Sequence, residues 1–555
     1  MSKYKITIDD RNYTEYKFFE INHYNEIKLD IDPIEYKLFN GDVFEYNDNN
    51  FTLSHSIVQS MDNIPGVLIV SGDILGKKGG RWMYKCIPDD KRLPCFVIPL
   101  GEKTKNNFLT VKYNRYITFK FNKWDKKHPE GFIQNNLGTI NELNPYYEYQ
   151  LYCKCLNHSI QKFTNDCKEN IRDNIIEDIS NVNKIINRTN EYVFTIDSPN
   201  TLEFDDAYSI HEFEHYTKLS IYITNVAIIL DNLNLWESFT DRISTIYLPD
   251  KKRPMLPTIL SSSLCSLIKK QKRIVYGMDI IFNGSTINIS FNQYLIKVTN
   301  NFYHDTDLSK NVYYKLLQKY VNILHDEYKF SKLLNSPEDT VSYLMMFMNY
   351  QCSKRFINYN SGIFRSSSIS NVNESVPDEV LQFIQILNSS SGIYTTEVCK
   401  PHELLKFDSY LHITSPIRRI VDLLNSIILL SNEKIYKFTS KAFEFYNKWI
   451  NQLDYINQTS KTIRKIQFDC NLLNKFYHDE TISEKIFDGY IFDKLYRNDG
   501  LIQYSVYIPS IKMSARLTIK NEYDNFTKHS FSIHIIKNTD KFKKKVRLHI
   551  KDHEE

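Results

Sequence analysis

The chain has 555 residues, of which 42% are hydrophobic and 25% charged, and its formal net charge at pH 7 is +4. This length exceeds what one hydrophobic core holds and predicts several domains, and the composition excludes wholesale disorder. Because the charge is close to neutral, a nucleic-acid partner would have to be met by a local basic surface.

The first part of the chain predicts a small β-barrel. Residues 1–58 show no strong hydrophobic period and are treated as an N-terminal extension. Residues 59–158 contain short strand-like runs between turns rich in Gly, Pro and Lys, which predict a small barrel or sandwich. The runs are VLIV (67–70), CFVIPL (95–100), NFLTVKY (107–113), YITFKF (116–121) and YYEYQLYC (146–153). Cations and aromatic residues share the loops, which suits a binder of single-stranded RNA, although a solvated rim fits the composition equally well.

The middle of the chain has a mixed α/β texture. Strand-like runs occur at 218–230 (KLSIYITNVAIIL) and 274–282 (IVYGMDIIF). Apolar residues recur at helical spacing over 311–334, 338–357 and 434–476. Residues 159–476 therefore predict one mixed α/β domain that ends in long helices.

Residues 477–555 return to five strand-like runs, which fit a C-terminal OB-type barrel. The last run, KKKVRLHI at 543–550, is basic and would contact phosphates, with a plain solvated edge strand as the competing interpretation. The predicted fold class is thus multidomain α+β, with β-barrel modules on both sides of a central α/β domain.

Cysteine usage and hydropathy predict the compartment. The nine cysteines are odd in number and scattered, which argues against a disulfide framework and favours a reducing compartment. The first residues, MSKYKITIDDRNY, lack the apolar core of a signal peptide. The longest apolar run, LLNSIILL at 423–430, is far shorter than the ~18 residues that span a bilayer. We expect an intracellular, cytoplasmic protein with no membrane partner.

One segment concentrates negative charge. TIDSPNTLEFDDAYSI at 195–210 places Asp197, Glu203, Asp205 and Asp206 within ten residues, directly after an apolar strand-like run. Four like charges in one loop repel one another and gain from a hard metal ion between them. Two Mg²⁺ ions about 4 Å apart would clamp the attacking and leaving oxygens of a phosphodiester. As a bare pattern, however, a strand followed by acids is more often a solvated turn.

The same segment resembles the signature of the RNase II / RNase R (RNB) exoribonuclease family, in which a strand ending in TID is followed by a D-x-D-D cluster. Further landmarks of that family appear in order: YLPDKKRPMLPTILSSSLCSL (247–267), NNFYHDT (300–306) and HELLKFDSYLHITSPIRRIVDLL (402–424). IPGVLIVSGDILGKKGGRWMYKCIPDDKRLPCFVIP (64–99), within residues 59–158, resembles the second cold-shock-type OB module of the eukaryotic members around the exosome catalytic subunit. KIFDGYIF (485–492) resembles the C-terminal OB module that closes the family, so the resemblance runs from about residue 60 to the end. No PIN-type nuclease domain is recognised ahead of it, so an endonuclease activity is not expected.

The resemblance implies a processive 3′-to-5′ exoribonuclease that hydrolyses single-stranded RNA to nucleoside 5′-monophosphates by a two-metal mechanism. It implies an RNB catalytic domain at 159–476 between two RNA-binding modules, two Mg²⁺ ions with Mn²⁺ as a substitute, and no obligate protein partner. It carries over three sets of residues: catalytic Asp205, Tyr303 and Arg418; metal-binding Asp197, Glu203, Asp205 and Asp206; RNA-binding Tyr247, Tyr303, Arg418 and Arg419.

The chain also departs from the family pattern. Glu203 stands where the family has an aspartate, Ser342 and Tyr343 replace a pair of glutamates, and Asn225 and Asn425 replace an aspartate and a histidine. Two alternatives therefore stay open. The first is a catalytically degenerate RNA-binding or scaffolding protein, and the second is another metal-dependent phosphodiesterase that cuts internally.

Overall fold

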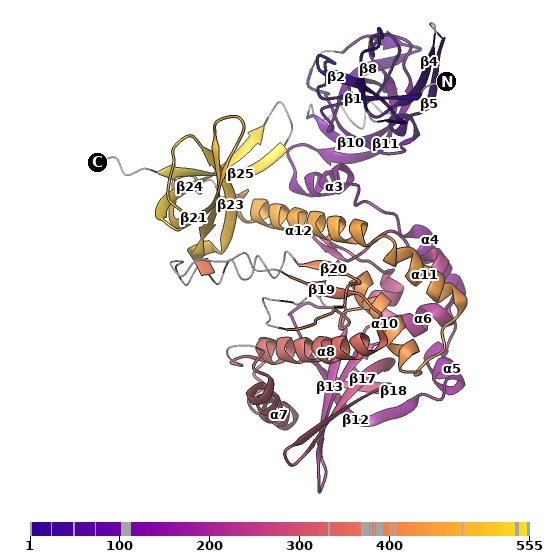
Figure 1. Ribbon diagram of the computed structural model, residues 1–555, viewed down its shortest axis with the longest axis vertical. Coiled ribbons are helices and arrows are strands. Elements are labelled where there is room, and N and C mark those ends of the chain that lie inside the picture. The colour runs from indigo at the N-terminus through magenta and orange to yellow at the C-terminus, as the bar shows by residue number, and fades with distance from the viewer. Residues whose placement is uncertain are drawn as a thin grey trace.

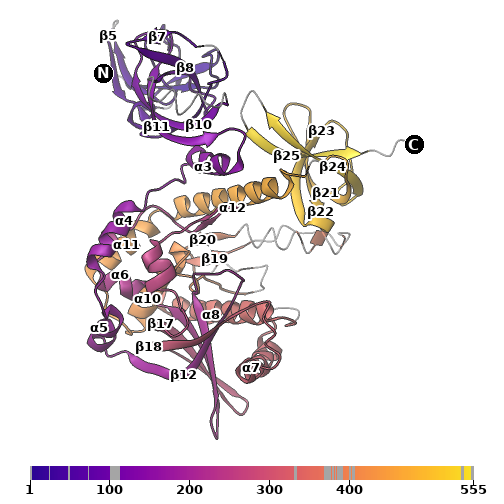
Figure 2. The same ribbon diagram turned by 180° about the vertical axis from the view of Figure 1, so that it is seen from behind.

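The computed structural model describes residues 3–23, 25–47, 50–72, 74–100, 113–330, 334–367, 392–398, 407–479, 481–538 and 543–551, together with Pro377, Val380, Leu381, Phe383 and His402. Figures 1 and 2 show β-rich modules from the two ends of the chain gathered at one end of the molecule, beside the long helix α12 (Leu453–Phe476), with a central α/β domain below it. The expected multidomain α+β fold with β-barrel modules is confirmed.

The N-terminal residues, for which the sequence predicted only an extension, contain a five-stranded antiparallel sheet of order β3-β2-β1-β4-β5. Its strands are β1 (Lys3–Ile8), β2 (Tyr16–Glu20), β3 (Glu26–Ile27), β4 (Val43–Asn47) and β5 (Asn50–His55), followed by helix α1 (Ile57–Ser60). No strand buries more than two side chains, so none carries a hydrophobic period long enough to be recognised in the sequence.

A second β-module follows, with sheet order β6-β10-β11-β9-β8-β7, and a further pairing of β6 with β8 curls it into the expected barrel. Its strands are β6 (Ile64–Leu68), β7 (Lys77–Lys78), β8 (Arg81–Pro88), β9 (Phe96–Leu100), β10 (Arg115–Lys123) and β11 (Glu130–Thr139). Residues 107–112 of one predicted strand lie outside the described residues. The module shares one hydrophobic core with the N-terminal sheet, and Arg11 joins the two by donating to the carbonyls of Pro88 and Leu93 at 2.8 Å.

The run YYEYQLYC, predicted as a strand, belongs instead to helix α3 (Leu143–Cys153). The prediction was wrong because tyrosine is enriched in strands, whereas here tertiary packing decides the conformation. Tyr146, Tyr147 and Tyr149 are all buried around the helix, and Tyr149 stacks on Tyr116 of β10 with ring centroids 4.5 Å apart.

The central domain is built on a closed five-stranded barrel of order β12-β13-β14-β17-β18. Its strands are β12 (Ile186–Asp197), β13 (Asp206–Glu212), β14 (Thr217–Thr224), β17 (Lys272–Asn283) and β18 (Thr286–Tyr303). The predicted strand at 218–230 ends early, because Asn225 accepts a hydrogen bond from the Ile228 N–H at 3.1 Å and caps helix α6 (Val226–Asn232). Strand β12 pairs in parallel with β18, so both strands end at the same rim of the barrel.

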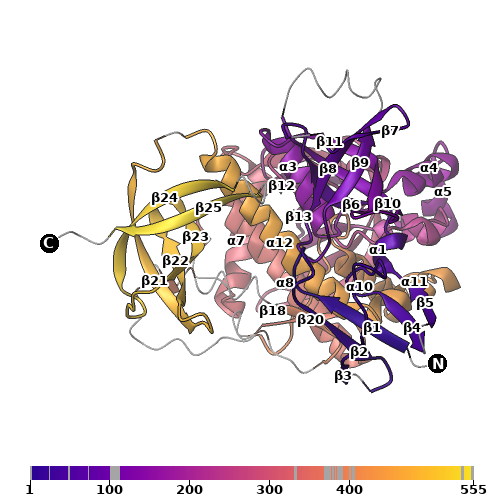
Figure 3. The same ribbon diagram turned by 90° about the horizontal axis from the view of Figure 1, so that it is seen from above.

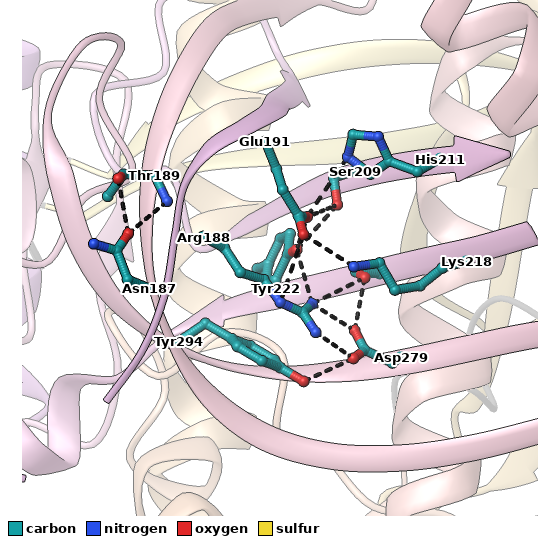
Figure 4. A network of polar contacts seen from close by, with 11 residues as sticks. Asn187, Arg188, Thr189, Glu191, Ser209, His211, Lys218, Tyr222, Asp279 and Tyr294 are labelled. Atoms are coloured by element: carbon teal, nitrogen blue, oxygen red, sulfur yellow. Dashed lines mark hydrogen bonds and ion pairs between the residues drawn. The ribbon is translucent and has the colours of Figure 1, made fainter. Parts of the chain in front are cut away.

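A network of charged and hydroxyl side chains connects all five strands of this barrel (Figure 4). The Arg188 guanidinium donates to both carboxylate oxygens of Asp279 at 2.8 and 2.6 Å, and it lies 3.6 Å from the centre of the Tyr294 ring. Glu191 accepts from Lys218 and Tyr222 at 2.9 and 3.0 Å. Opposite charges paired in this way compensate the cost of removing each charge from water.

Helices pack around the barrel and lead to the C-terminal module (Figure 1). Besides α6 and α12 they are α4 (Gln161–Asn170), α5 (Ile175–Val182), α7 (Val312–Tyr328), α8 (Pro337–Tyr359), α10 (Ile420–Asn432) and α11 (Ser440–Ile450). A capping box of Ser336 and Asp339 with Pro337 in the first turn begins α8. The single helix predicted over 434–476 is two helices, α11 and α12. The remaining short strands are β15 (Ile246–Tyr247), β16 (Lys252–Arg253), β19 (Phe364–Ser366) and β20 (Ile393–Thr395). Short helical segments are a π-helix at Leu260–Leu264 and 3-10 helices at Trp236–Ser238 and Pro509–Ile511.

The C-terminal module, predicted as an OB-type barrel of five strands, is a five-stranded sheet of order β23-β22-β21-β24-β25. Its strands are β21 (Ile486–Tyr496), β22 (Ile502–Ile508), β23 (Met513–Ile519), β24 (Lys528–Asn538) and β25 (Lys543–Lys551). Figure 3 shows it beside α12. Lys544 of the predicted basic strand is buried: its ammonium donates to the carbonyl of Glu142 at 3.0 Å, and its own carbonyl accepts from Tyr146. At this position β25 therefore connects the C-terminal module to helix α3 and the residue before it.

The described helices offer no candidate for a membrane-spanning segment. Eight of the nine cysteines are described and all eight are free, while Cys399 lies outside the described residues.

Candidate active site

A cavity of about 740 Å³ opens at the rim of the barrel where β12 and β18 end. Its walls come from the loop 198–206, the β15–β16 hairpin, one face of α8, and the segment 410–419 that precedes α10. Parts of the chain more than two hundred residues apart therefore meet here. All four carboxylates of the segment 195–210 line this cavity, so the segment is not a solvated turn.

Strand topology brings the carboxylates together. Asp197 is the last residue of β12, and Asp206 begins the antiparallel strand β13, so both lie at the same rim. Ser266 holds the loop between them: its hydroxyl accepts from the Phe204 N–H and donates to the Leu202 carbonyl, both at 3.0 Å. The loop is therefore fixed on either side of Glu203.

Asp197 and Asp206 form a pair of acids with little compensating charge. Burial and the neighbouring charge of Asp206 raise the pKa of Asp197 to about 8. Burial also raises the pKa of Asp206, although the Tyr208 hydroxyl donates to its carboxylate and opposes the shift. Oδ2 of Asp197 and Oε1 of Glu203 are both buried and accept no hydrogen bond from any described residue. Two neighbouring carboxylates whose pKa values are raised would gain from a cation between them.

Asp205 is bonded to the arginine motif 212 residues further along the chain. It is 3% exposed. Its Oδ1 accepts from the Ile417 N–H at 3.0 Å, and its Oδ2 accepts from Nε of Arg418 at 3.1 Å. Burial raises the pKa of Asp205 to about 7 against the opposing charge of Arg418. Arg418 donates in addition to the Ser415 hydroxyl at 3.0 Å, so its guanidinium is held on two sides at the cavity wall.

Glu203 faces a different cation. Its Oε1 lies 3.0 Å from Nζ of Lys252 on β16, and the Glu203 side chain is almost fully buried. The neighbouring Arg253 donates to Asp250 and Glu148 at 2.6 and 2.8 Å, which fixes the β15–β16 hairpin that presents Lys252. Within the acid segment, Glu203 therefore has a lysine as counter-ion and Asp205 has an arginine.

The other predicted site residues take different positions. Arg419 lines the cavity, but its guanidinium also donates to the buried Asp422 at 2.8 Å. Tyr247 lines the cavity and is 44% exposed. Tyr303 is the backbone neighbour of Asp197 across β12 and β18 and is 36% exposed, but its side chain is not part of the cavity wall.

The structure adds residues that the sequence did not single out. His304, which follows Tyr303, lines the cavity, and its backbone N–H donates to the backbone carbonyl of Asp197 at 2.8 Å. Lys252 and Glu338 also line it. Glu338 and Ser342 are four residues apart on α8 and thus share one face, a spacing that the sequence could have revealed.

The departures from the family pattern have separate structural consequences. Tyr343 is fully buried in the core and is not in the cavity wall. Asn425 donates to the carbonyls of Ile363 and His412 and accepts from the Ile363 N–H, all at 2.9 Å. Asn225 caps α6. Of the four replaced positions other than Glu203, only Ser342 therefore changes the cavity.

The donor set fits one hard divalent cation. Carboxylate oxygens are ligands that Mg²⁺ and Mn²⁺ favour, and Asp197 supplies a buried oxygen without a partner. In the part of the chain that the structure describes, no three Asp, Glu, His or Cys side chains already converge closely enough to hold a metal. Metal binding by these carboxylates thus stays a prediction.

The pKa of Asp197 predicts how the metal-free protein responds to pH. The folded-state pKa lies above the ordinary value of about 4, so the folded protein holds this proton more tightly than the unfolded chain does. The free energy of unfolding therefore falls as pH rises from about 4 to about 8. In EDTA at pH 8, we expect Asp197→Asn to melt several degrees above the wild type, since ~1 kcal/mol corresponds to roughly 2–4 °C in domains of this size.

Asp279→Asn is the matched control for that experiment. Although burial opposes it, the paired Arg188 lowers the pKa of Asp279, so the loss of this carboxylate should lower the melting temperature at the same pH. At pH 4 the gain in Asp197→Asn should disappear. A melting temperature of Asp197→Asn at or below the wild-type value at pH 8 would contradict the prediction.

Comparisons with known proteins agree with this geometry. Residues 186–307, which span the barrel and the acid segment, match the family model described as RNB domain. Ribonuclease R of Mycoplasmopsis pulmonis is 30% identical over 156 residues, which are 27% of this chain and 22% of that protein. DIS3-like exonuclease 2 of Schizosaccharomyces pombe is 25% identical over 226 residues, which are 39% of this chain and 24% of that protein. The chain thus covers less than a quarter of either curated relative.

Solved structures share the fold over nearly the whole chain. RNase R of Mycoplasma genitalium, in complex with ribose-methylated single-stranded RNA, superposes with a TM-score of 0.68 at 15% identity, covering 99% of this chain and 100% of that one. Yeast Ssd1, described as a pseudonuclease, gives a TM-score of 0.55 at 14% identity, covering 96% of this chain and 80% of that one. At these identities the likeness concerns the fold alone.

Proposed function

The chain belongs to the RNB family, and we propose on this basis that it is a 3′-to-5′ exoribonuclease that hydrolyses single-stranded RNA to nucleoside 5′-monophosphates. The observation that carries the proposal is the meeting of Asp197, Asp205, Asp206 and Arg418 in one cavity. Such a site combines oxygen ligands for a hard cation with a fixed guanidinium for a phosphate. These are the parts that hydrolysis of a phosphodiester requires.

A second pocket supports an RNA substrate. It has a volume of about 200 Å³ and shares Tyr247, Arg418 and Arg419 with the catalytic cavity. Arg464 of α12 also lines it, and no acidic residue is among its described wall residues. Three arginines beside a phosphodiester-cleaving cavity suit the next phosphates of a polyanion, and Tyr247 is placed to stack on a base. Contacts of this kind hold several nucleotides without reading sequence, as processive degradation requires.

The chain's own residues account for most of the proposed mechanism. Asp205 orients Arg418, and the Arg418 guanidinium binds the scissile phosphate and stabilises the charge that develops on it. The backbone bonds around Ser266 keep the acids in place before substrate binds. Mg²⁺ held by Asp197 and Asp206 would supply Lewis-acid polarisation of the phosphodiester. Tyr303, beside Asp197 at the rim, would pack against the 3′-terminal nucleotide.

A second candidate function is a catalytically degenerate RNA-binding or scaffolding protein. Two observations favour it: the likeness to the pseudonuclease Ssd1 and the departures at Glu203 and Ser342, which both line the cavity. The three aspartates and Arg418, however, are all present and in contact with one another or with the cavity. The enzyme is therefore the function that the site supports best.

The deciding experiment uses RNA labelled at either end. Purified protein is incubated with 5′-labelled or 3′-labelled single-stranded RNA in Mg²⁺ or Mn²⁺, and a circular RNA of the same sequence serves as control. We expect 3′-labelled mononucleotide at once, progressive shortening of the 5′-labelled strand, and an intact circle. Binding without cleavage in either metal would support the degenerate alternative, and cleavage of the circle would indicate an internal phosphodiesterase.

A further inference from the structure

Glu203 and Lys252 form an ion pair inside the cavity wall. Their 3.0 Å separation joins two elements that are fixed independently: the acid loop by Ser266, and the β15–β16 hairpin by Arg253. Glu203 is 8% exposed. A pair at an exposed surface contributes little, whereas a buried carboxylate requires a counter-ion, and Lys252 supplies it for Glu203.

The length of the glutamate matters for this contact. A glutamate reaches one methylene further than the aspartate that the family pattern has at this position, and its carboxylate here meets the lysine of the facing hairpin. Asp205 is occupied in the same way by Arg418 and the Ile417 N–H. Two of the four acids therefore have protein cations as partners.

The remaining charge is that of Asp197 and Asp206. Glu338 is a fifth acid in the cavity wall, but it is exposed on α8 and is solvated. Arg419, the other cation of the wall, is paired with Asp422 behind the cavity. Among the described residues, neither Asp197 nor Asp206 forms an ion pair with a side chain, and the charge of the two carboxylates together matches that of a single divalent ion.

We infer that the Lys252 ammonium takes the place of a second metal ion, so that this site binds one divalent cation, on Asp197 and Asp206, and Glu203 is not a metal ligand. The inference rests on the proposed metal-dependent function but differs from the two-metal expectation. Lys252 acts through Glu203 and is thus a positioning residue: it neutralises the carboxylate and keeps it turned away from the metal.

The test counts bound metal rather than activity. Mn²⁺ binding to the full-length protein is measured by titration calorimetry and by the loss of the free-Mn²⁺ resonance signal, without RNA. We expect one Mn²⁺ in the wild type and in Glu203→Gln. Lys252→Met should gain a second Mn²⁺ site, about tenfold weaker than the first, because Glu203 loses its counter-ion. The double variant Lys252→Met/Glu203→Gln should return to one site.

Lys251→Met is the matched control, since this lysine is exposed on the same hairpin and does not line the cavity. Circular dichroism confirms that each variant is folded. Two Mn²⁺ ions in the wild type with one in Glu203→Gln would overturn the inference, as would a Lys252→Met protein with a single site. If the wild type binds two Mn²⁺ ions and cleaves RNA, the one-metal inference is refuted and the proposed function stands. If the wild type binds one Mn²⁺ ion and does not cleave RNA, the proposed function is refuted and the one-metal inference stands.

Discussion

Asp205→Asn is expected to lower the rate of mononucleotide release by roughly 10²- to 10³-fold, the range seen when one preorganised electrostatic partner is removed from a site. The carboxylate accepts from both Arg418 and the Ile417 N–H, and an amide cannot satisfy both contacts with the same charge. The guanidinium then loses its orientation, and the negative field at Asp197 and Asp206 weakens. Single-turnover cleavage of 3′-labelled RNA in Mg²⁺ measures the effect, with binding measured separately.

Asp279→Asn provides the control for a general effect of breaking a buried Asp–Arg pair. Asp279 binds Arg188 through two hydrogen bonds of similar length, in the barrel and outside the cavity wall. Its variant should lose stability but keep the wild-type rate per folded molecule. Equal losses of rate in both variants would mean that Asp205 acts only through the fold.

Arg418→Lys is expected to reduce the same rate by roughly 10²-fold, even though the charge is retained. Arg418 contacts Asp205 through Nε and Ser415 through Nη2, and these two bonds direct the remaining guanidinium donors into the cavity. A lysine presents one point charge and cannot make this fork. The loss should appear in kcat more than in KM, because the contact strengthens as charge develops on the phosphate.

Guanidinium ions offer a more specific test of that role. In Arg418→Ala, millimolar guanidinium should restore part of the lost rate, whereas it should not rescue Asp205→Asn. Arg188→Lys, in the barrel, is the matched variant for a buried arginine and should leave kcat unchanged. A wild-type kcat in Arg418→Lys would exclude a bidentate contact with the phosphate in the rate-limiting step.

Much of the architecture followed from local patterns. Alternating strands at 59–158 and 477–555 identified the two barrels, because period-two burial leaves a readable trace in the sequence. The N-terminal sheet left none, since its strands bury no more than two side chains each. Tyrosine-rich α3 was assigned wrongly for the opposite reason: the residues favour strands, but their burial against Tyr116 and the C-terminal module favours a helix.

Part of the candidate site could likewise be predicted from the sequence, and part could not. The resemblance of three contiguous motifs to the family pattern predicted Asp197, Asp205 and Asp206, Tyr303 and Arg418 as site residues, because each motif can be recognised from a short stretch of sequence. The pairing of the acids could be read from the three-dimensional structure alone: Arg418 contacts Asp205 and Lys252 contacts Glu203, while Oδ2 of Asp197 has no hydrogen-bond partner among the described residues. Such pairings depend on strand ends and loops that meet across long stretches of chain. Local hydrophobic periodicity does not reveal such pairings. In this protein the pairings decide which carboxylates remain available to a metal ion.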